Sequence, residues 1–209
     1  MPRQDIIDLD DATVLGEGSI LPPSLLSFYS DLGDRILWLD HDIEEDDIEY
    51  VKYILRWNRE DTGVPVAKRI PIRLMLFTNG GDLDVCRALM DAIRASKTPV
   101  YGYNMGKAYS AGAFIFLVCH QRFALPTSKF MLHKGHLGLQ GTVDEVSVAM
   151  QQESADQEAL VDMVVEHSNL PRDLVKRRIG TDWYIDAVDA CAVYGMVDEL
   201  ITDFDGMMG

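Results

Sequence analysis

A unit of apolar strand, glycine turn and helix occurs twice in succession in this chain, and it constrains the fold more than any other feature. In chain order the two units comprise a strand over 72–77, glycines at 80 and 81, a helix over 83–96, a strand over 100–105, a turn over 106–110 and a helix over 111–119. This repetition predicts an α/β architecture in which functional sites gather where the strands end. The second helix is apolar on nearly all sides, so we expect it to be buried.

The chain reads as one domain preceded by an arm. Residues 1–27 form the predicted N-terminal arm, because residues 1–25 mix acids, glycines and prolines without a helical or strand period. Residues 28–209 form the domain, and 47% hydrophobic content is enough for one core. Other expected elements are a strand over 35–39, a helix from the acidic cluster after 41 to about 57, a loop over 58–70, a strand ending at 133, helices over 142–167, 171–180 and 186–195, and a strand over 196–201.

Charge and composition exclude several partners. A net charge of −15 at pH 7 repels phosphate backbones, so we expect neither nucleic acid nor an anionic membrane as a partner. The longest apolar run, 111–119, is far shorter than the roughly 20 residues that cross a bilayer. The N-terminus lacks the basic start and apolar stretch of a secretory signal, which predicts a cytoplasmic location. Cys86, Cys119 and Cys191 lie far apart in apolar segments, as reduced core cysteines do.

Ser110 is a candidate nucleophile because it lies where a strand turns into a helix. A helix N-terminus offers unpaired backbone N–H groups and a positive dipole end to a developing oxyanion. Serine is also a favoured helix cap, so the two roles stay open on this stretch alone. Ala108 stands where a Gly-x-Ser-x-Gly elbow has its first glycine, which disfavours the α/β-hydrolase fold.

His133 is the candidate general base, since an apolar strand ends at it and fixes its direction. His136 competes for the same role, whereas the other histidines lie in contexts typical of surface or helix positions. Spacing alone does not select the orienting carboxylate among 34 acidic residues. The pair Gly80-Gly81 could direct backbone N–H groups into a site, although a plain tight turn is the alternative. No phosphate-binding glycine motif occurs.

Four segments resemble, in the same order, the motifs of ClpP, the family of proteolytic subunits of the Clp protease. They are Leu76-Phe-Thr-Asn-Gly-Gly81, Gly106-Lys-Ala-Tyr-Ser-Ala-Gly-Ala113, Ser128-Lys-Phe-Met-Leu-His133, and Thr181-Asp-Trp-Tyr-Ile-Asp-Ala187 with Tyr194-Gly-Met-Val-Asp198. The resemblance implies that Ser110 is the nucleophile, His133 the general base and Asp182 the orienting carboxylate. It also implies that the backbone N–H groups of Gly81 and Ala111 form the oxyanion hole.

The same resemblance, which runs from about Phe28 to Thr202, implies a crotonase-like fold and a serine endopeptidase. Such an enzyme hydrolyses peptides or unfolded proteins inside homo-oligomeric rings of seven subunits, with the helix over 142–167 interlocking two rings. It needs no metal or organic cofactor. ATP is used only by a separate AAA+ unfoldase that feeds the chamber.

The chain departs from the ClpP pattern at several positions. Asn79 stands where the family usually has proline, and Lys134-Gly135 stand where Gln-Pro usually follows the histidine. Thr181 stands where an arginine beside the aspartate is expected, and the loop over 58–70 looks longer than usual. These departures indicate a divergent member, of the phage-encoded or accessory kind.

Three other hypotheses stay open. A Ser/Lys peptidase of the signal-peptide-peptidase or prohead-protease type would use Lys134 in place of His133. A crotonase relative that processes acyl-CoA shares the strand-turn-helix plan and the oxyanion hole but requires no serine nucleophile. A ClpP-like ring subunit that is inactive, or active only with a partner, would keep the fold without the activity.

Overall fold

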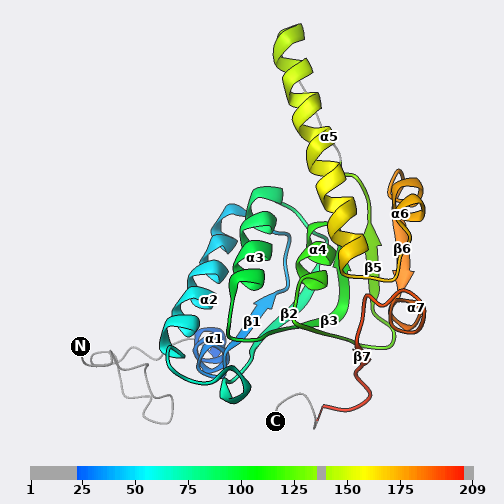
Figure 1. Cartoon of the computed structure of the whole chain (residues 1–209). Coiled ribbons are helices and arrows are strands. Elements are labelled where there is room, and N and C mark those ends of the chain that lie inside the picture. The colour runs from blue at the N-terminus through cyan, green and yellow to red at the C-terminus, as the bar shows by residue number, and fades with distance from the viewer. Residues whose placement is uncertain (1–22, 136–139, 205–209) are drawn as a thin grey trace.

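A mostly parallel sheet runs through the molecule and carries helices on one face (Figure 1). The computed structural model describes residues 23–135 and 140–204. The helices are α1 (Pro23–Gly33), α2 (Glu49–Glu60), α3 (Leu83–Ala95), α4 (Ala111–Leu117), α5 (Val143–Glu166), α6 (Arg172–Arg178) and α7 (Ala187–Ala192), with 3-10 turns η2 (Glu45–Ile48) and η3 (Val66–Lys68). The strands are β1 (Ile36–Leu39), β2 (Ile72–Thr78), β3 (Val100–Tyr109), β4 (Gln121–Ala124), β5 (Lys129–Leu132), β6 (Trp183–Asp186) and β7 (Glu199–Leu200).

The long central strand β3 determines the topology. Five strands follow the parallel order β1-β2-β3-β4-β7. The first half of β3, Tyr101–Asn104, pairs with β4, and the second half, Lys107–Tyr109, pairs with β5. β5 in turn pairs with β6 in antiparallel fashion. The sheet therefore divides at β3, and only its β5–β6 branch continues past the ends of β2 and β3.

The core lies between the sheet and helices α2, α3 and α4, which lie side by side in Figure 1. All seven residues of α4 are buried, as the apolar sequence predicts. Among residues 23–135 and 140–204, the opposite sheet face carries a small cluster around Met75 and Tyr103, and Trp38 and Phe77 beside it are 41% and 44% exposed. Among the residues that the structure describes, no helix is long and apolar enough to cross a membrane.

The predicted turn over 106–110 is wrong, because β3 continues through it to Tyr109. The register with β2 passes from Leu76 opposite Asn104 to Thr78 opposite Ala108, so β3 bulges between these pairs. The buried Asn104 side chain accepts a hydrogen bond from the Gly106 N–H at 3.0 Å and donates to the Lys129 carbonyl at 3.0 Å. An internal glycine in a strand often marks such a bulge, and here the asparagine satisfies the displaced backbone groups.

Other boundaries also differ from the sequence predictions. α1 begins at Pro23, inside the segment predicted to be irregular, with proline in the first turn, where its missing N–H costs nothing. β4 and β6 were not predicted, since each has only four residues and a weak pattern. α2 extends to Glu60, and η3 interrupts the predicted loop. The capping box at Thr142 is confirmed, with Glu145 N donating to Thr142 Oγ1 and the Glu145 carboxylate accepting from Thr142 N.

The three cysteines are free, as predicted. Cys86 and Cys119 are fully buried in the core, and Cys191 is half-buried. Burial raises the pKa of the Cys86 and Cys119 thiols to about 12, because the thiolate is poorly solvated there. These two thiols are therefore unreactive packing residues.

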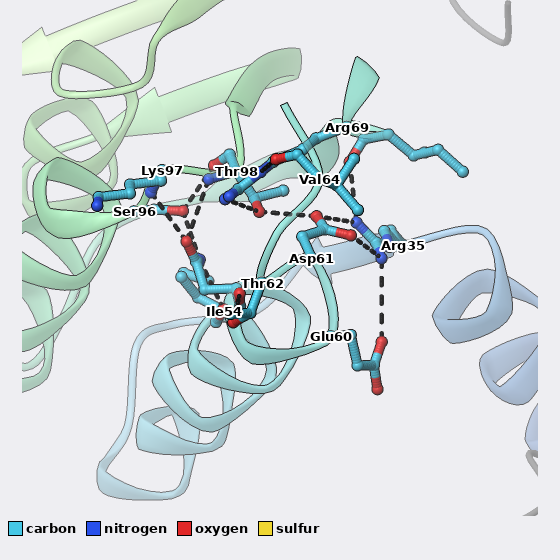
Figure 2. A network of polar contacts seen from close by, with 12 residues as sticks. Arg35, Ile54, Glu60, Asp61, Thr62, Val64, Arg69, Ser96, Lys97 and Thr98 are labelled. Carbon is cyan, nitrogen blue, oxygen red and sulfur yellow. Dashed lines mark hydrogen bonds and ion pairs between the residues drawn. The ribbon is translucent and has the colours of Figure 1, made fainter. Parts of the chain in front are cut away.

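A polar network fixes the segment that joins α2 to β2 (Figure 2). Asp61, at the end of α2, accepts hydrogen bonds from two Arg35 nitrogens at 2.7 and 2.9 Å and from Thr98 Oγ1 at 2.8 Å. Arg69 donates to the Val64 carbonyl at 3.0 Å and to Thr98 Oγ1 at 3.3 Å. The hydrogen bonds from Arg35 lower the pKa of the Asp61 carboxyl from its usual value, because they stabilise the charged form.

We expect Asp61→Asn to lower the free energy of unfolding by about 2 kcal/mol at pH 7, because it leaves the largely buried Arg35 guanidinium with only the Glu60 carboxylate, 3.9 Å away, as a counter-charge. The native pKa of Asp61 is depressed, so its contribution is present above the usual aspartate pKa and is lost as the pH falls through the native pKa. The difference between wild type and variant should therefore shrink in acid, as measured by urea unfolding at fixed protein concentration.

Glu49→Gln is the matched control, because Glu49 pairs with Lys52 at a position where both side chains are more than half exposed. This variant should change stability little at any pH, as exposed ion pairs usually contribute little. Equal losses in the two variants would contradict a special role for the Arg35–Asp61 pair.

Candidate active site

Ser110 occupies the single residue between β3 and α4, in a backbone conformation that side-chain-bearing residues rarely adopt. Its φ is 52° and its ψ is −122°. The Ser110 N–H donates to the Met131 carbonyl at 2.8 Å, which ties this residue to β5. The hydroxyl makes no capping hydrogen bond to α4, so the cap alternative is wrong. Strained backbone of this kind is concentrated at functional sites, where the surrounding structure holds it in place.

Strand register brings His133 and Asp182 to Ser110. Leu132 of β5 pairs with Trp183 of β6, so the residue after Leu132 and the residue before Trp183 lie opposite each other. His133 Nδ1 lies 3.1 Å from Asp182 Oδ1, and His133 Nε2 lies 2.8 Å from Ser110 Oγ. An aspartate at Nδ1 favours the tautomer with the proton there, so that Nε2 accepts the hydrogen bond that the serine hydroxyl donates.

The histidine is more sheltered than the carboxylate. The His133 side chain is 15% exposed, whereas that of Asp182 is 51% exposed. The imidazole is thus held between Ser110 and Asp182, while the carboxylate of Asp182 is half exposed to solvent.

The Gly80-Gly81 pair lines the same cleft as His133 and packs against Ser110 and Ala111. A Cβ on Gly80 would lie 2.7 Å from the Ser110 Cβ and 3.0 Å from the Ala111 nitrogen, so only glycine allows this approach. Gly81 forms a parallel bridge with Ile43, in which Ile43 N–H donates to the Gly80 carbonyl at 2.8 Å and Asp82 N–H donates to the Ile43 carbonyl at 2.9 Å. Because the flanking residues bond to Ile43, the N–H of Gly81 itself points away from Ile43.

An open cleft of about 360 Å³ joins these residues. Its lining consists of Asp42, Asn79, Gly80, Gly81, Leu83, Ser110, Phe114, His133, Lys134, Gly135 and Leu160. Ala111 begins α4 directly beside it and is fully buried. The residues predicted as nucleophile, base and oxyanion-hole donors are thus brought together at the ends of β2, β3 and β5, with the predicted carboxylate behind the base.

The competing candidates have different fates. His136 lies outside the described residues. Lys134 lines the cleft, but the hydrogen bond to Ser110 Oγ involves His133, and the Lys134 N–H donates to the Ile179 carbonyl at 3.0 Å. His120 accepts a hydrogen bond from the Val100 N–H at 3.0 Å and is not among the residues that line the cleft.

Sequence reasoning missed two residues that support the site. Thr78 is buried, and its Oγ1 accepts a hydrogen bond from the Gly80 N–H at 3.0 Å. Its methyl carbon packs so closely on Gly112 that a Cβ added to this glycine would lie 2.4 Å from it. Ile43 holds the Gly80-Gly81 segment through the bridge described above. A threonine that ends a strand shortly before two glycines is a weak sequence signal for the role of Thr78. Nothing in the acidic segment around Ile43 indicates the role of that residue.

The Clp protease family model matches residues 29–204, and the chain belongs to this family. The predicted α/β, ClpP-like fold is therefore confirmed. The chain is similar to the ATP-dependent Clp protease proteolytic subunit 2 of Treponema pallidum, with 29% identity over 133 residues, which is 63% of this chain and 66% of the relative. For the proteolytic subunit of Deinococcus radiodurans the identity is 28% over 132 residues, which is 62% of this chain and 64% of the relative.

A third relative aligns over more of the chain. Proteolytic subunit 2 of Corynebacterium glutamicum is 25% identical over 178 residues, which is 84% of this chain and 85% of the relative. The chain spans slightly less than two thirds of the length of the first two relatives.

Backbone strain at position 110 leads to a stability prediction. Glycine adopts positive φ without a steric penalty, whereas alanine there keeps the strain and loses the hydroxyl. We expect Ser110→Gly to be about 1 kcal/mol more stable than Ser110→Ala, after allowance for the greater freedom of glycine in the unfolded chain. Urea unfolding of the two variants measures the difference, and an alanine variant of equal or higher stability would show that this backbone is not strained.

Proposed function

We propose that this protein is a serine endopeptidase in which Ser110, His133 and Asp182 form the catalytic triad. The observation that carries this proposal is the hydrogen-bonded chain from Ser110 Oγ through the imidazole to the Asp182 carboxylate, with lengths of 2.8 and 3.1 Å. A serine hydroxyl is a weak nucleophile until a base within this reach takes its proton. Membership of the Clp protease family supports the same chemistry.

In the proposed reaction, Ser110 Oγ attacks the carbonyl carbon of a peptide bond while its proton passes to His133 Nε2. The resulting imidazolium is stabilised by Asp182. As the tetrahedral intermediate collapses, Nε2 returns the proton to the leaving amine, and the acyl group stays on Ser110. A water molecule then attacks the ester with the same base, which releases the carboxylic acid and restores the hydroxyl.

The negative charge on the tetrahedral intermediate needs donors on the other side of the nucleophile. We assign this role to the backbone N–H groups of Gly81 and Ala111. Gly81 directs its N–H away from Ile43, and the N–H of Ala111 is the first of α4, which has no partner within the helix. Backbone donors fixed in this way stabilise charge without reorganising during the reaction.

The alternatives are less well supported. A Ser/Lys peptidase needs an amine at the serine hydroxyl, a place that His133 occupies. An acyl-CoA-processing crotonase relative has no use for a serine hydrogen-bonded to a histidine and a carboxylate. An inactive or partner-activated ring subunit stays compatible with the geometry, and the labelling experiment below decides it.

Assembly into rings fits the uncovered surfaces of the chain. Parallel sheets are normally covered on both faces, yet the face around Trp38 and Phe77 carries exposed aromatic side chains. Helix α5 projects well beyond the other helices in Figure 1, and its outer half carries Val143, Val148 and Met150, each at least 60% exposed. We propose that copies of this chain cover the sheet face to form seven-membered rings, and that α5 joins two rings.

We further propose that an AAA+ unfoldase delivers unfolded protein to these rings. The support is the name of the similar proteins, which are called subunits of an ATP-dependent protease. The nucleotide would bind to that partner, since this chain contains no glycine-rich phosphate loop.

The triad is tested by labelling with a fluorophosphonate at neutral pH, with peptide mapping of the adduct. Wild-type protein should be labelled at Ser110. Asp182→Asn should lower the labelling rate about 10³- to 10⁴-fold, because the tautomer of His133 is no longer fixed, and His133→Ala should lower it at least as much. Asp186→Asn should label at the wild-type rate. Asp182 directly precedes β6 and Asp186 is its last residue, an exposed carboxylate that contacts Lys129 rather than the histidine.

Two outcomes would contradict the proposal in different ways. Absence of labelling in folded wild-type protein would favour the inactive or partner-activated subunit. Labelling that survives His133→Ala but not Lys134→Met would favour the Ser/Lys mechanism.

The ring proposal is tested by native mass spectrometry. Wild-type protein should have seven or fourteen times the 23.5 kDa mass of the chain. Trp38→Glu should reduce the mass towards that of the monomer, because it buries a charge in the proposed interface. Leu55→Glu is the control, as Leu55 is 62% exposed on α2, on the helical side of the sheet. Wild-type assembly that persists in Trp38→Glu would contradict the assignment of this face.

A further inference from the structure

Asn79 is the centre of a charged network beside the cleft. It stands where the resemblance to ClpP leads us to expect a proline. Asn79 Nδ2 donates to Asp42 Oδ1 at 2.9 Å, and Lys107 Nζ donates to Asn79 Oδ1 at 2.6 Å. The amide oxygen thus faces a cation and the amide nitrogen faces an anion. Each charge polarises the amide in the direction that strengthens the other hydrogen bond.

The network joins the three segments that surround the proposed oxyanion hole. Asp42 immediately precedes Ile43, whose backbone holds Gly80 and Asp82 through two hydrogen bonds. Asn79 immediately precedes Gly80, and both Asn79 and Asp42 line the cleft. Lys107 lies on the second half of β3, three residues before Ser110.

The lysine is itself fixed in place. Its Nζ lies 4.9 Å from the centroid of the Phe77 ring, a cation–π distance. A Cβ on Gly106 would lie only 2.8 Å from the same ring, so the bulge at Gly106 brings β3 close to the end of β2, where Lys107 contacts Phe77 and Asn79. The Lys107 side chain therefore has two partners, Phe77 in β2 and Asn79 directly after it, and these contacts restrict its rotamers.

We propose that Asp42, Asn79 and Lys107 form a brace that positions the Gly81 N–H for the oxyanion. Proline restricts this kind of backbone through its ring and its missing N–H. In this chain the side chain of Asn79, held from both sides by charges, would supply the restriction instead. This inference rests on the proposed function, and the three residues act through the backbone of Gly80-Gly81 rather than on the substrate.

The test uses full-length Asp42→Ala, Asn79→Ala and Lys107→Met proteins. Each should lower the rate of fluorophosphonate labelling at Ser110, and kcat for a fluorogenic peptide, by about tenfold. This is less than the 10²- to 10³-fold effect of deleting an oxyanion donor, because the donor is displaced rather than removed. KM should change less than twofold. Lys129→Met is the matched control, since Lys129 is the register partner of Lys107 but forms an ion pair with Asp186, and it should behave as wild type.

Coupling distinguishes a brace from separate effects. Asp42→Ala or Lys107→Met should cause no further loss when added to Asn79→Ala, because the amide that links them is already gone. In an Asn79→Pro background, Asp42→Ala should likewise have no effect on labelling. Additive losses, or a raised KM with unchanged kcat, would overturn the proposal and place these side chains in substrate binding.

Amide hydrogen exchange tests the brace without reference to activity. The Asp82 N–H, which donates to the Ile43 carbonyl, should exchange about tenfold faster in Asp42→Ala and Lys107→Met than in wild type or Lys129→Met. Unchanged exchange together with wild-type labelling would overturn the brace while leaving the triad intact. If wild-type protein is not labelled at all, the proposed function fails, and faster exchange in the variants would still support the brace as a structural device. All variants should keep the native mass of the wild type, which excludes an effect through assembly.

Discussion

The continuation of β3 beyond Asn104 is the constraint on which the candidate site depends. If the chain turned at Gly106, β5 would lose its pairing with β3 and keep only β6 as a neighbour, and Ser110 would lose its hydrogen bond to Met131. The Asn104 side chain makes the continuation possible, because it satisfies the Gly106 N–H on the bulge and holds the Lys129 carbonyl of β5. One buried amide thereby positions the nucleophile and, through β5, the base.

Pairing between strands then places the three candidate catalytic residues relative to one another, with little contribution from loops. The end of β3 lies beside β5, and β5 and β6 pair up to Leu132 and Trp183, so the base and its carboxylate follow directly from the register. A one-residue slip would reverse the faces of all side chains on the shifted strand and separate the base from the serine. The strained backbone at Ser110 is tolerable for the same reason, since it is held by β5 on one side and by the fully buried helix α4 on the other.

The sequence predicted the elements whose pattern is long, and it failed where a single residue decides between a turn and a strand. The repeated strand and helix units, the capping box at Thr142 and the buried α4 follow from periodicity and capping chemistry. The residues Ser110 and His133 follow from their places at element ends. The choice of Asp182 came only from the family resemblance, because β6 is too short to be recognised and its pairing with β5 is long-range. The role of Asn104 was not predictable, since an asparagine two residues before a glycine is as typical of a turn as of a bulge.

The proline that the family resemblance leads us to expect at position 79 and the asparagine that this chain has there would restrict the backbone in physically different ways. A proline ring restricts the backbone covalently and is insensitive to solvent. The amide of Asn79 is held by a carboxylate and an ammonium group in hydrogen bonds that lie near solvent, and such interactions weaken as salt screens the charges. If the brace acts as proposed, the order of the Gly80-Gly81 segment depends on ionic strength. Asp42 and Asn79 also place polar groups on the cleft wall, whereas a proline at position 79 would be apolar.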